Sequence, residues 1–464
     1  MNLFRTKAIN ADLIHEGKLR RVLGPVDLTV LGIGCIIGAG IFVLTGHAAA
    51  TRAGPGIVLS YVMAGSACAF AALAYAELAS AIGGCGSAYG YAYAGLGELM
   101  AWVIGWDLLL EYGVSVPTVA LGWASYMNDA LTSMGFPIPP HLLHGPFDPV
   151  PGLINLPAAL VILCLGVLLA VGVKVSAHFN AAMVAVKLAV LALFIGVAVF
   201  NVDPINWTPF MPFGWGGVMK GAALIFFAYI GFDAVSTAAE EARNPAKDLP
   251  TGILASLALC TVLYIVVSGL LTGIVPYGTL NGASPVAEAL LRVGHRIAGG
   301  VIAVGAIAGL TTVMLVLYFG LTRIFLAISR DGLLPPVFAA VHPVTRTPVR
   351  VIMVSGAAMA LIAGFTPIEG VAELVNIGTL AAFVMVCAGV IVLRVTQPDL
   401  PRPFKTPFSP LIPLLGIVFC LYLMLSLPGV TWLRFLIWML IGLAIYFTYS
   451  HRNSNLAKQA AAAE

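Results

Sequence analysis

A succession of long apolar segments is the feature that most constrains the fold of this 464-residue chain. A helix needs about 20 mostly apolar residues to cross a bilayer, and lipid offers no partner to exposed backbone polar groups. Only 9% of the residues are charged, whereas a soluble domain carries about a quarter. The pattern predicts an all-α polytopic membrane protein. The predicted transmembrane helices, about twelve in number, cover residues 26–50, 55–82, 88–129, 153–173, 178–200, 216–241, 249–275, 298–328, 348–366, 371–395, 410–428 and 431–450.

The third apolar run is too long for a single crossing. Its opening part, Ser87 to Gly97, is rich in tyrosine and glycine, so we expect it to lie in the membrane interface before the helix descends. A further short helix is expected between two spans, where Ser284 and Pro285 precede Glu288 and Arg292.

The distribution of lysine and arginine predicts the orientation of the chain. With a cytoplasmic N-terminus, one set of loops and both tails carry most of these residues, and positive charge is typical of cytoplasmic loops. The opposite side carries only Arg52, Lys220, Arg292, Arg296 and Arg434. We therefore expect a multi-pass protein of the cell (cytoplasmic) membrane with both termini in the cytoplasm.

The first predicted span contains four closely spaced glycines, Gly32, Gly34, Gly38 and Gly40. Each glycine destabilises a helix by roughly 1 kcal/mol relative to alanine. In a membrane, irregular backbone is tolerated only where it lines a cavity or packs on protein. The stretch indicates either a helix break that presents backbone dipoles to a ligand or a motif for close helix packing.

A second interruption is predicted at residues 226–233, five spans later, where Gly231 precedes the acidic Asp233. A kink in a continuous helix is the alternative. Interrupted helices at corresponding positions of two halves are typical of a transporter binding site. Because an odd number of crossings reverses direction, five spans per half predict an inverted repeat. The expected regions are a tail at 1–25, repeats at 26–200 and 216–395, accessory helices at 410–450 and a tail at 451–464.

Two facing helix breaks restrict the chemistry of the ligand. The half-helix that begins at a break presents free N–H groups and a positive dipole end, and the half-helix that ends there presents carbonyls and a negative end. A carboxylate and an ammonium on one carbon atom satisfy both ends. This description fits an α-amino acid.

Three motifs resemble those of the amino acid–polyamine–organocation superfamily. Residues 32–42 (GIGCIIGAGIF) are similar to its first-span signature, 227–233 (FAYIGFD) with 240–245 (EEARNP) to its sixth span and the exit from it, and 329–335 (SRDGLLP) to the loop after its eighth span. The resemblance covers nearly the whole chain and is closest to the bacterial cationic amino acid transporter branch, which carries proton-coupled permeases. It implies a 5+5 inverted-repeat fold of the LeuT type, with helices 1 and 6 broken and spans 1, 2, 6 and 7 packed against spans 3, 4, 8 and 9.

The resemblance also implies how the substrate is held. Its carboxylate would meet backbone N–H groups, and its ammonium would meet backbone carbonyls, with one aromatic side chain as a gate over the substrate. The N–H groups are those of Gly38, Ala39 and Gly40, the carbonyls are those of Ile36, Ile37, Phe227, Ala228 and Ile230, and the gate is Phe227. Many relatives have a hydroxyl residue where this chain has Ala39, so the backbone alone would hold the carboxylate.

Lys187 lies near the middle of the fifth predicted span, roughly 13 Å deep at about 1.5 Å per residue. A buried lysine is costly, and burial favours its neutral form. The resemblance implies that a lysine here replaces the sodium ion of other members, so we expect Lys187 to couple transport to protons, contacting carbonyls near Gly34 when protonated. The alternative is a structural lysine paired with a carboxylate. Glu111, which shares a helix face with Asp107, is the candidate partner and could also tune Lys187.

Other polar residues are given simpler roles. Glu77, towards the cytoplasmic end of the second span, is expected to brace a basic loop. The seven cysteines and eight histidines have no ligand spacing, so no metal or cofactor is expected.

The function expected from these observations is secondary active import of L-amino acids by proton symport with alternating access. Residues 311–318, which would wall the side-chain pocket, are apolar and favour small neutral substrates. The expected partners are the amino acid, the proton and membrane lipid; a net charge of +3 does not indicate nucleic acid. An amino acid exchanger is the main alternative. A sensor would need a larger cytoplasmic domain, and an enzyme would need a nucleophile with its base or a cluster of acid–base residues.

Overall fold

The computed structural model describes residues 5–6, 23–82, 87–172, 177–238, 241–282, 284–343, 345 and 347–463. Within these ranges the regular structure is helical, apart from one isolated parallel bridge between Leu23 and Ala242. At this bridge the Leu23 N–H donates to the Glu241 carbonyl at 3.0 Å, and the Arg243 N–H donates to the Leu23 carbonyl at 2.8 Å. The backbone just before the first membrane helix is thus joined to the backbone that follows the sixth span.

Eight helical segments of the described chain are long and apolar enough to cross a membrane, and four shorter apolar helices accompany them. Together they match the predicted spans and confirm an all-helical polytopic protein. The membrane helices are α2 (Pro25–Ile36) with α3 (Thr45–Ala48), α4 (Ile57–Ile82), α6 (Glu98–Ser133), α7 (Leu156–Val171), α8 (Ala177–Ala198), α9 (Gly214–Ile225), α10 (Pro245–Ile274), α12 (Arg296–Arg330), α13 (Val349–Phe365), α14 (Ile368–Thr396), α15 (Leu411–Leu425) and α16 (Gly429–Ile445). The short connecting and terminal helices are α5 (Ser87–Gly95), α11 (Pro285–Arg292), α17 (His451–Asn453) and α18 (Asn455–Ala463).

Both predicted short helices are present, and the position of Ser87 to Gly97 in the membrane interface stays a prediction. Helix α5 is separate from α6, because the chain turns at Gly97, whose φ of 94° lies in the left-handed region that favours glycine. Helix α11 begins at Pro285, whose missing N–H is tolerated in the first turn.

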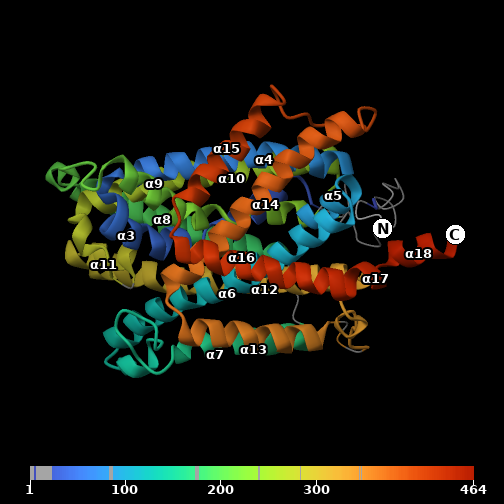
Figure 1. Cartoon of the computed structure of the whole chain (residues 1–464). Coiled ribbons are helices and arrows are strands. Elements are labelled where there is room, and N and C mark those ends of the chain that lie inside the picture. The colour runs from blue at the N-terminus through green and yellow to red at the C-terminus, as the bar shows by residue number, and fades with distance from the viewer. Residues whose placement is uncertain are drawn as a thin grey trace.

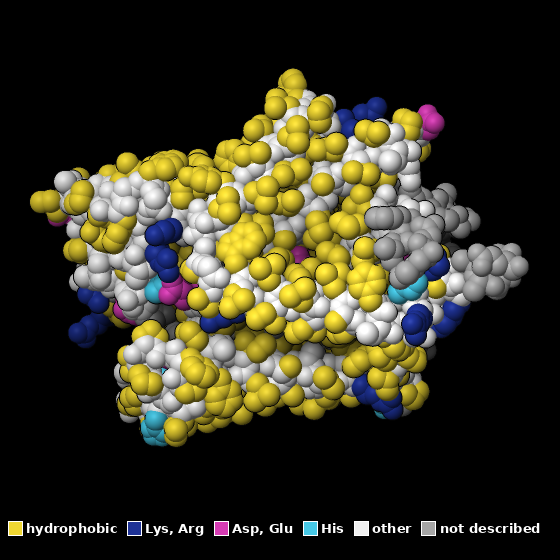
Figure 2. Space-filling model, viewed as in Figure 1, with side chains coloured by type: hydrophobic (Ala, Val, Ile, Leu, Met, Phe, Trp, Pro, Cys, Tyr) yellow, Lys and Arg dark blue, Asp and Glu magenta, His cyan; other side chains and the backbone are white. Residues whose placement is uncertain are grey.

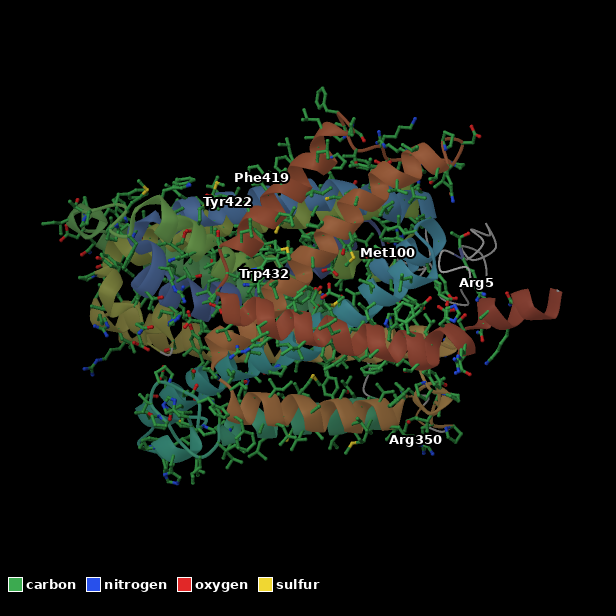
Figure 3. All side chains as sticks on the ribbon, in the orientation of Figure 1. Arg5, Met100, Arg350, Phe419, Tyr422 and Trp432 are labelled. Carbon is green, nitrogen blue, oxygen red and sulfur yellow. The ribbon has the colours of Figure 1, made fainter. Side chains whose placement is uncertain are left out.

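The long helices run roughly along one axis of the molecule, with α7 and α13 paired along one edge (Figure 1). Hydrophobic side chains cover most of the visible face, and most charged side chains lie towards the two ends (Figure 2). Arg5, Arg350 and α18 lie at the same end (Figure 3). On α15, Tyr422 is exposed, whereas the Phe419 ring packs against Phe70 of α4 with the ring centroids 5.3 Å apart (Figure 3). An apolar belt between charged ends is the surface that a bilayer requires.

The helices pack in the two groups that the sequence motifs imply. Helix α10 packs on α2 and α4, and α4 packs on α9, which groups spans 1, 2, 6 and 7. Helix α6 packs on α7, α12 and α13, and α7 packs on α13, which groups spans 3, 4, 8 and 9. The two-fold inverted relation between the halves stays a prediction.

Glu77 holds the end of α4 to the chain that connects α14 with α15. Arg394 donates to its two carboxylate oxygens from Nε at 2.9 Å and from Nη2 at 2.7 Å. The Thr406 N–H donates to Oε2 at 2.8 Å, and Arg402 Nε lies 3.5 Å from Oε1. The prediction that Glu77 braces a basic segment is confirmed. We call these four residues the Glu77 cluster.

Candidate functional site

The first membrane span opens where the glycines predict a break. Helix α2 ends at Ile36, and Ile37 has an extended backbone with φ −74° and ψ 102°. A π-helical turn then begins at Gly40, and the Phe42 N–H donates to the Gly38 carbonyl at 3.4 Å. The first N–H groups of a helix have no partner within it. The stretch is therefore an opened helix and not merely a packing motif.

The sixth span is interrupted in the same way. Helix α9 ends at Ile225 and continues as a 3-10 turn, Phe226–Tyr229. Ile230 is extended, with φ −62° and ψ 134°, and Gly231 has a φ of 113°, which favours glycine. A second 3-10 turn, Asp233–Ala238, completes the span. This is a break and not a kink in a continuous helix.

The two breaks touch each other, and glycine makes the contact possible. A Cβ atom added at Gly40 would lie 2.2 Å from the Ala228 Cα. A Cβ atom added at Gly231 would lie 2.9 Å from the Cys35 Cβ. Backbone atoms of spans 1 and 6 thus face one another at van der Waals distance on both sides of the site.

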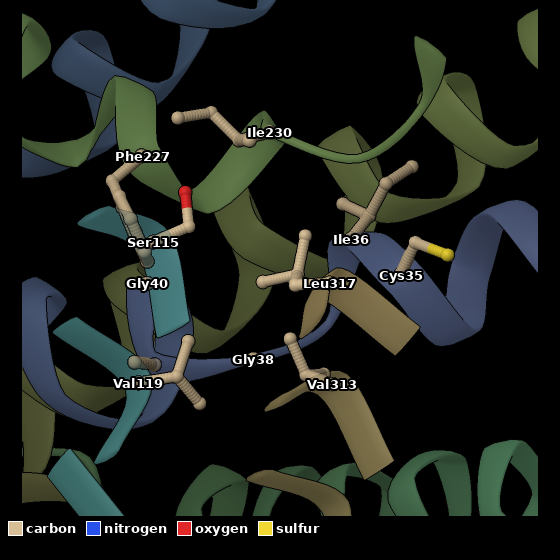
Figure 4. Close-up of a pocket in the computed structure, with 11 residues that line it drawn as sticks. Cys35, Ile36, Gly38, Gly40, Ser115, Val119, Phe227, Ile230, Val313 and Leu317 are labelled. Atoms are coloured by element: carbon tan, nitrogen blue, oxygen red, sulfur yellow. The ribbon is translucent and has the colours of Figure 1, made fainter. Parts of the chain in front are cut away.

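A small cavity of about 10 Å³ lies between the breaks and helices α6 and α12 (Figure 4). Its lining includes six of the eight predicted substrate-binding residues, namely Ile36, Gly38, Ala39, Gly40, Phe227 and Ile230. The other two, Ile37 and Ala228, are buried beside it without lining it. The remaining lining residues are Cys35, Ser115, Val119, Val313 and Leu317.

Val313 and Leu317 belong to the apolar wall that the sequence predicts on the eighth span. Ser115 and Val119 on α6 are not predicted. A signal for them exists, because they continue a series at intervals of four residues that begins with Asp107 and Glu111. Residues four apart lie on one helix face, so this series places polar groups along the inner face of a membrane helix.

Tyr264 on α10 ties the two breaks together and is also absent from the prediction. Its hydroxyl lies 2.9 Å from the Ile36 carbonyl oxygen and 3.0 Å from that of Ala228. A hydroxyl has one proton, so the two carbonyls share one donor. Both belong to the predicted ammonium-binding set, and each oxygen keeps a second lone pair.

Lys187 lies on α8 with its side chain 1% exposed. Its Nζ donates to the Gly34 carbonyl at 2.7 Å, which is the contact that the sequence predicts. On the other side, a Cβ atom added at Gly309 of α12 would lie 3.1 Å from the Lys187 Cε. The ammonium thus joins α8 to the last turn of α2, directly before the first break.

Glu111, the predicted partner of Lys187, does not lie beside it. In the described part of the chain no ion pair joins it to Lys187, because α8 packs on α2 and α12 whereas this face of α6 looks towards α14 and the second break. Glu111 pairs with the Thr379 side chain on α14 and lies near Asp107 and Asp233. The structure therefore separates the lysine from a group of three carboxyl residues, with the first break between α8 and the second break.

The carboxyl residues are sparsely partnered. The Tyr112 hydroxyl donates to Asp233 Oδ2 at 3.4 Å. Asp233 Oδ1 and both oxygens of Asp107 have no hydrogen-bond partner among the described residues. Such groups are expensive to bury in charged form, so they are candidates for holding protons.

Comparison with known proteins indicates the family. The family model described as "Amino acid permease" matches residues 23–452. The chain is 51% identical over 463 residues to the branched-chain amino acid permease BcaP of Bacillus subtilis, covering 98% of this chain and 99% of that protein. It is 50% identical over 460 residues to the methylthioribose transporter of Bacillus subtilis, covering 98% and 100%. It is 32% identical over 573 residues to human cationic amino acid transporter 4, covering 96% and 89%.

Proposed function

Because the chain belongs to the amino acid permease family of the amino acid–polyamine–organocation superfamily, we propose that it imports neutral L-amino acids, small to branched-chain in size, by proton symport. It is a multi-pass membrane protein, and we place both termini in the cytoplasm. The observation that carries the proposal is the pair of facing helix breaks around an apolar cavity, with Lys187 bonded to the backbone beside the first break.

The two breaks supply the groups that an α-amino acid needs. The turn that starts at Gly40 directs the N–H groups of residues 38–40 towards the substrate carboxylate, with the positive end of its dipole. The ends of α2 and of the Phe226–Tyr229 turn direct carbonyls towards the ammonium. These contacts are common to every α-amino acid, so they set the class of ligand and not its side chain.

The rest of the lining selects the side chain. Val119, Val313 and Leu317 are apolar, and the side chains that line the cavity include no charged group. A cationic or anionic side chain would be desolvated there without a partner, which costs several kcal/mol. This supports neutral substrates, and it agrees with the branched-chain substrate in the name of one relative. Methylthioribose, named for another relative, carries several hydroxyls that an almost wholly apolar lining leaves unpaired.

Transport requires the lining to move. A cavity of about 10 Å³ has room for about one water molecule, so even a small amino acid needs the walls to separate. Phe227, which lines the cavity and is 6% exposed, is the side chain that we assign as the gate. Alternating access would then open the site to one side of the membrane at a time.

Proton coupling is assigned to Lys187 and Glu111. A protonated Lys187 holds the last turn of α2 through the Gly34 carbonyl. A neutral lysine has one donor fewer and no charge, so α2 is released to swing. Glu111, beside Asp233, is the carboxyl that would take up a proton close to the second break. The two groups have different partners, so we assign them as separate proton sites.

The test is uptake of labelled valine, leucine and alanine by purified protein in liposomes, with and without an inward proton gradient. We expect gradient-driven accumulation that Lys187→Ala abolishes and that Lys220→Ala, an exposed residue of α9, leaves intact. Uptake that ignores the gradient would contradict symport. Exchange of preloaded amino acid without net accumulation in the wild type would identify an exchanger instead.

A further inference from the structure

Ser115 differs from the other hydroxyl residues of α6 that the structure describes inside the membrane. Thr118 donates to the Val114 carbonyl at 3.0 Å, and Ser125 donates to that of Leu121 at 3.1 Å. Such bonds to the preceding turn are the usual way for a helix to satisfy a hydroxyl in an apolar setting. The Ser115 side chain is fully buried, yet its Oγ has no hydrogen-bond partner among the described residues.

The unpartnered hydroxyl lines the cavity. Figure 4 draws the Ser115 oxygen on the side of Phe227 and Ile230, with Val313 and Leu317 opposite. Leaving a buried hydroxyl unpaired costs about 1–3 kcal/mol. A ligand that supplies the missing hydrogen-bond partner removes this penalty. The side chain thus points to a polar atom on whatever occupies the cavity.

The position of Ser115 indicates which part of the ligand it meets. In the proposed function, on which this step rests, backbone groups of the two breaks hold the carboxylate and the ammonium. The surface left for the substrate side chain comes from α6 and α12. Ser115 is the hydroxyl of that surface, among Val119, Val313 and Leu317.

We propose that Ser115 Oγ hydrogen-bonds to a hydroxyl on the substrate side chain, so that the site takes β-hydroxy amino acids, threonine above all, beside branched apolar ones. Threonine has the branched shape of valine with a hydroxyl in place of one methyl. One hydroxyl in the wall matches one polar atom in the substrate. Larger polar side chains would place additional donors or acceptors against valine and leucine.

The threonine–valine pair therefore isolates the contribution of Ser115. One neutral hydrogen bond is worth about 0.5–1.5 kcal/mol net, which corresponds to about 2- to 12-fold in affinity. We expect the ratio of valine to threonine inhibition constants, measured against labelled valine uptake in liposomes, to fall by about this factor in Ser115→Ala. Ser125→Ala, the same change at a self-bonded serine of α6, is the matched control and should leave the ratio unchanged.

The outcomes separate this inference from the proposed function. If valine is transported but the ratio is the same in wild type and Ser115→Ala, the hydroxyl does not meet the substrate side chain and the inference fails alone. If Ser115→Ala weakens valine and threonine equally, the hydroxyl serves the groups that all amino acids share, and the inference also fails. Absence of uptake of any amino acid by the wild type would overturn the proposed function itself.

A second measurement needs no variant that could misfold. Threonine and allo-threonine differ only in the configuration at Cβ, which exchanges the positions of hydroxyl and methyl. A hydrogen bond from a fixed serine distinguishes them, because only one isomer can place its hydroxyl at Ser115 when its carboxylate and ammonium are held in the same way. We expect wild-type protein to bind threonine several-fold more or less tightly than allo-threonine, by about the worth of one hydrogen bond. Equal inhibition by the two isomers would contradict the assignment.

Discussion

Among the ionisable side chains that the described structure buries, Glu77 and Lys187 are buried in opposite ways. Glu77 has two arginines and a backbone N–H on its carboxylate, so each oxygen is partnered. Lys187 has one backbone carbonyl for its ammonium and no carboxylate paired with it in the described chain. The first arrangement balances charge within the fold, and the second leaves it unbalanced.

The difference indicates which buried charge has a structural role and which one can respond to protonation. A charge with a full set of partners gains nothing from a proton, so the Glu77 cluster is suited to fastening α4 to the segment between α14 and α15. A buried charge with a single neutral partner is only weakly stabilised, so it can gain or lose a proton. The change in protonation then alters the hydrogen bond that it makes to its partner. A membrane-embedded ionisable residue of this second kind is by default a functional candidate.

The largest effect should come from Lys187→Ala. Removal of the ammonium takes away the single bond to the Gly34 carbonyl, so proton-driven accumulation should fall to the level of protein-free liposomes. Stability should be little changed or increased, because an uncompensated buried charge is removed. Accumulation assays and thermal unfolding in detergent measure the two properties. A strongly destabilised variant would show that Lys187 is structural, like Glu77.

Glu77→Gln should show the reverse pattern. Removing one member of a buried ion pair costs roughly 3 kcal/mol, reduced here to about 2 kcal/mol because Arg394 is partly exposed. The midpoint of thermal unfolding should therefore fall, while the protein that remains folded should keep its dependence on the proton gradient. Loss of coupling at normal stability would contradict the distinction between the two sites.

Tyr264→Phe should have an intermediate effect. It removes the hydroxyl that the Ile36 and Ala228 carbonyls share, at a cost of about 1–2 kcal/mol, or about 5- to 30-fold in substrate affinity if the bond orders the bound state. Binding isotherms for valine in detergent measure it. Tyr422→Phe on the exposed face of α15 is the control, and unchanged binding by Tyr264→Phe would show that the breaks keep their geometry without the phenol.

Asp107→Asn should have the smallest effect. Neither carboxyl oxygen of Asp107 has a hydrogen-bond partner among the residues that the structure describes, so a neutral side chain of the same shape loses no described bond. We expect stability to change by less than about 1.5 kcal/mol, as for a volume-conserving substitution, and accumulation to remain. Loss of accumulation with normal stability would place Asp107 with Lys187 among the coupling groups.

Much of the architecture could be predicted, because lipid imposes strong rules on a chain. Apolar length gives the spans, and the glycines at 32–40 and 231 give the breaks, since few other causes explain bare backbone at depth. Depth alone indicates that Lys187 is buried, and its contact with Gly34 is implied by the family resemblance. These are features in which a short stretch of sequence determines its own structure.

The remaining site residues depend on how distant helices meet. Tyr264 lies on a helix whose sequence carries no signal for its two carbonyl partners, which are 228 and 36 positions away. The sequence offers Glu111 as a carboxylate partner for Lys187, but the packing of α6 against α14 places it beside Thr379 instead. Ser115 looks like an ordinary membrane serine until its missing backbone bond is seen.

The bridge between Leu23 and Ala242 couples the movements of the first and sixth spans. It joins the start of α2 to the segment after the second break through main-chain atoms alone. If α2 tilted when Lys187 released it, the segment after the second break would move with it, because the two segments are hydrogen-bonded to each other. Since no side chain takes part, ordinary substitutions leave the tie intact, and proline at 23 or 243, which removes an N–H donor, is the change that would cut it.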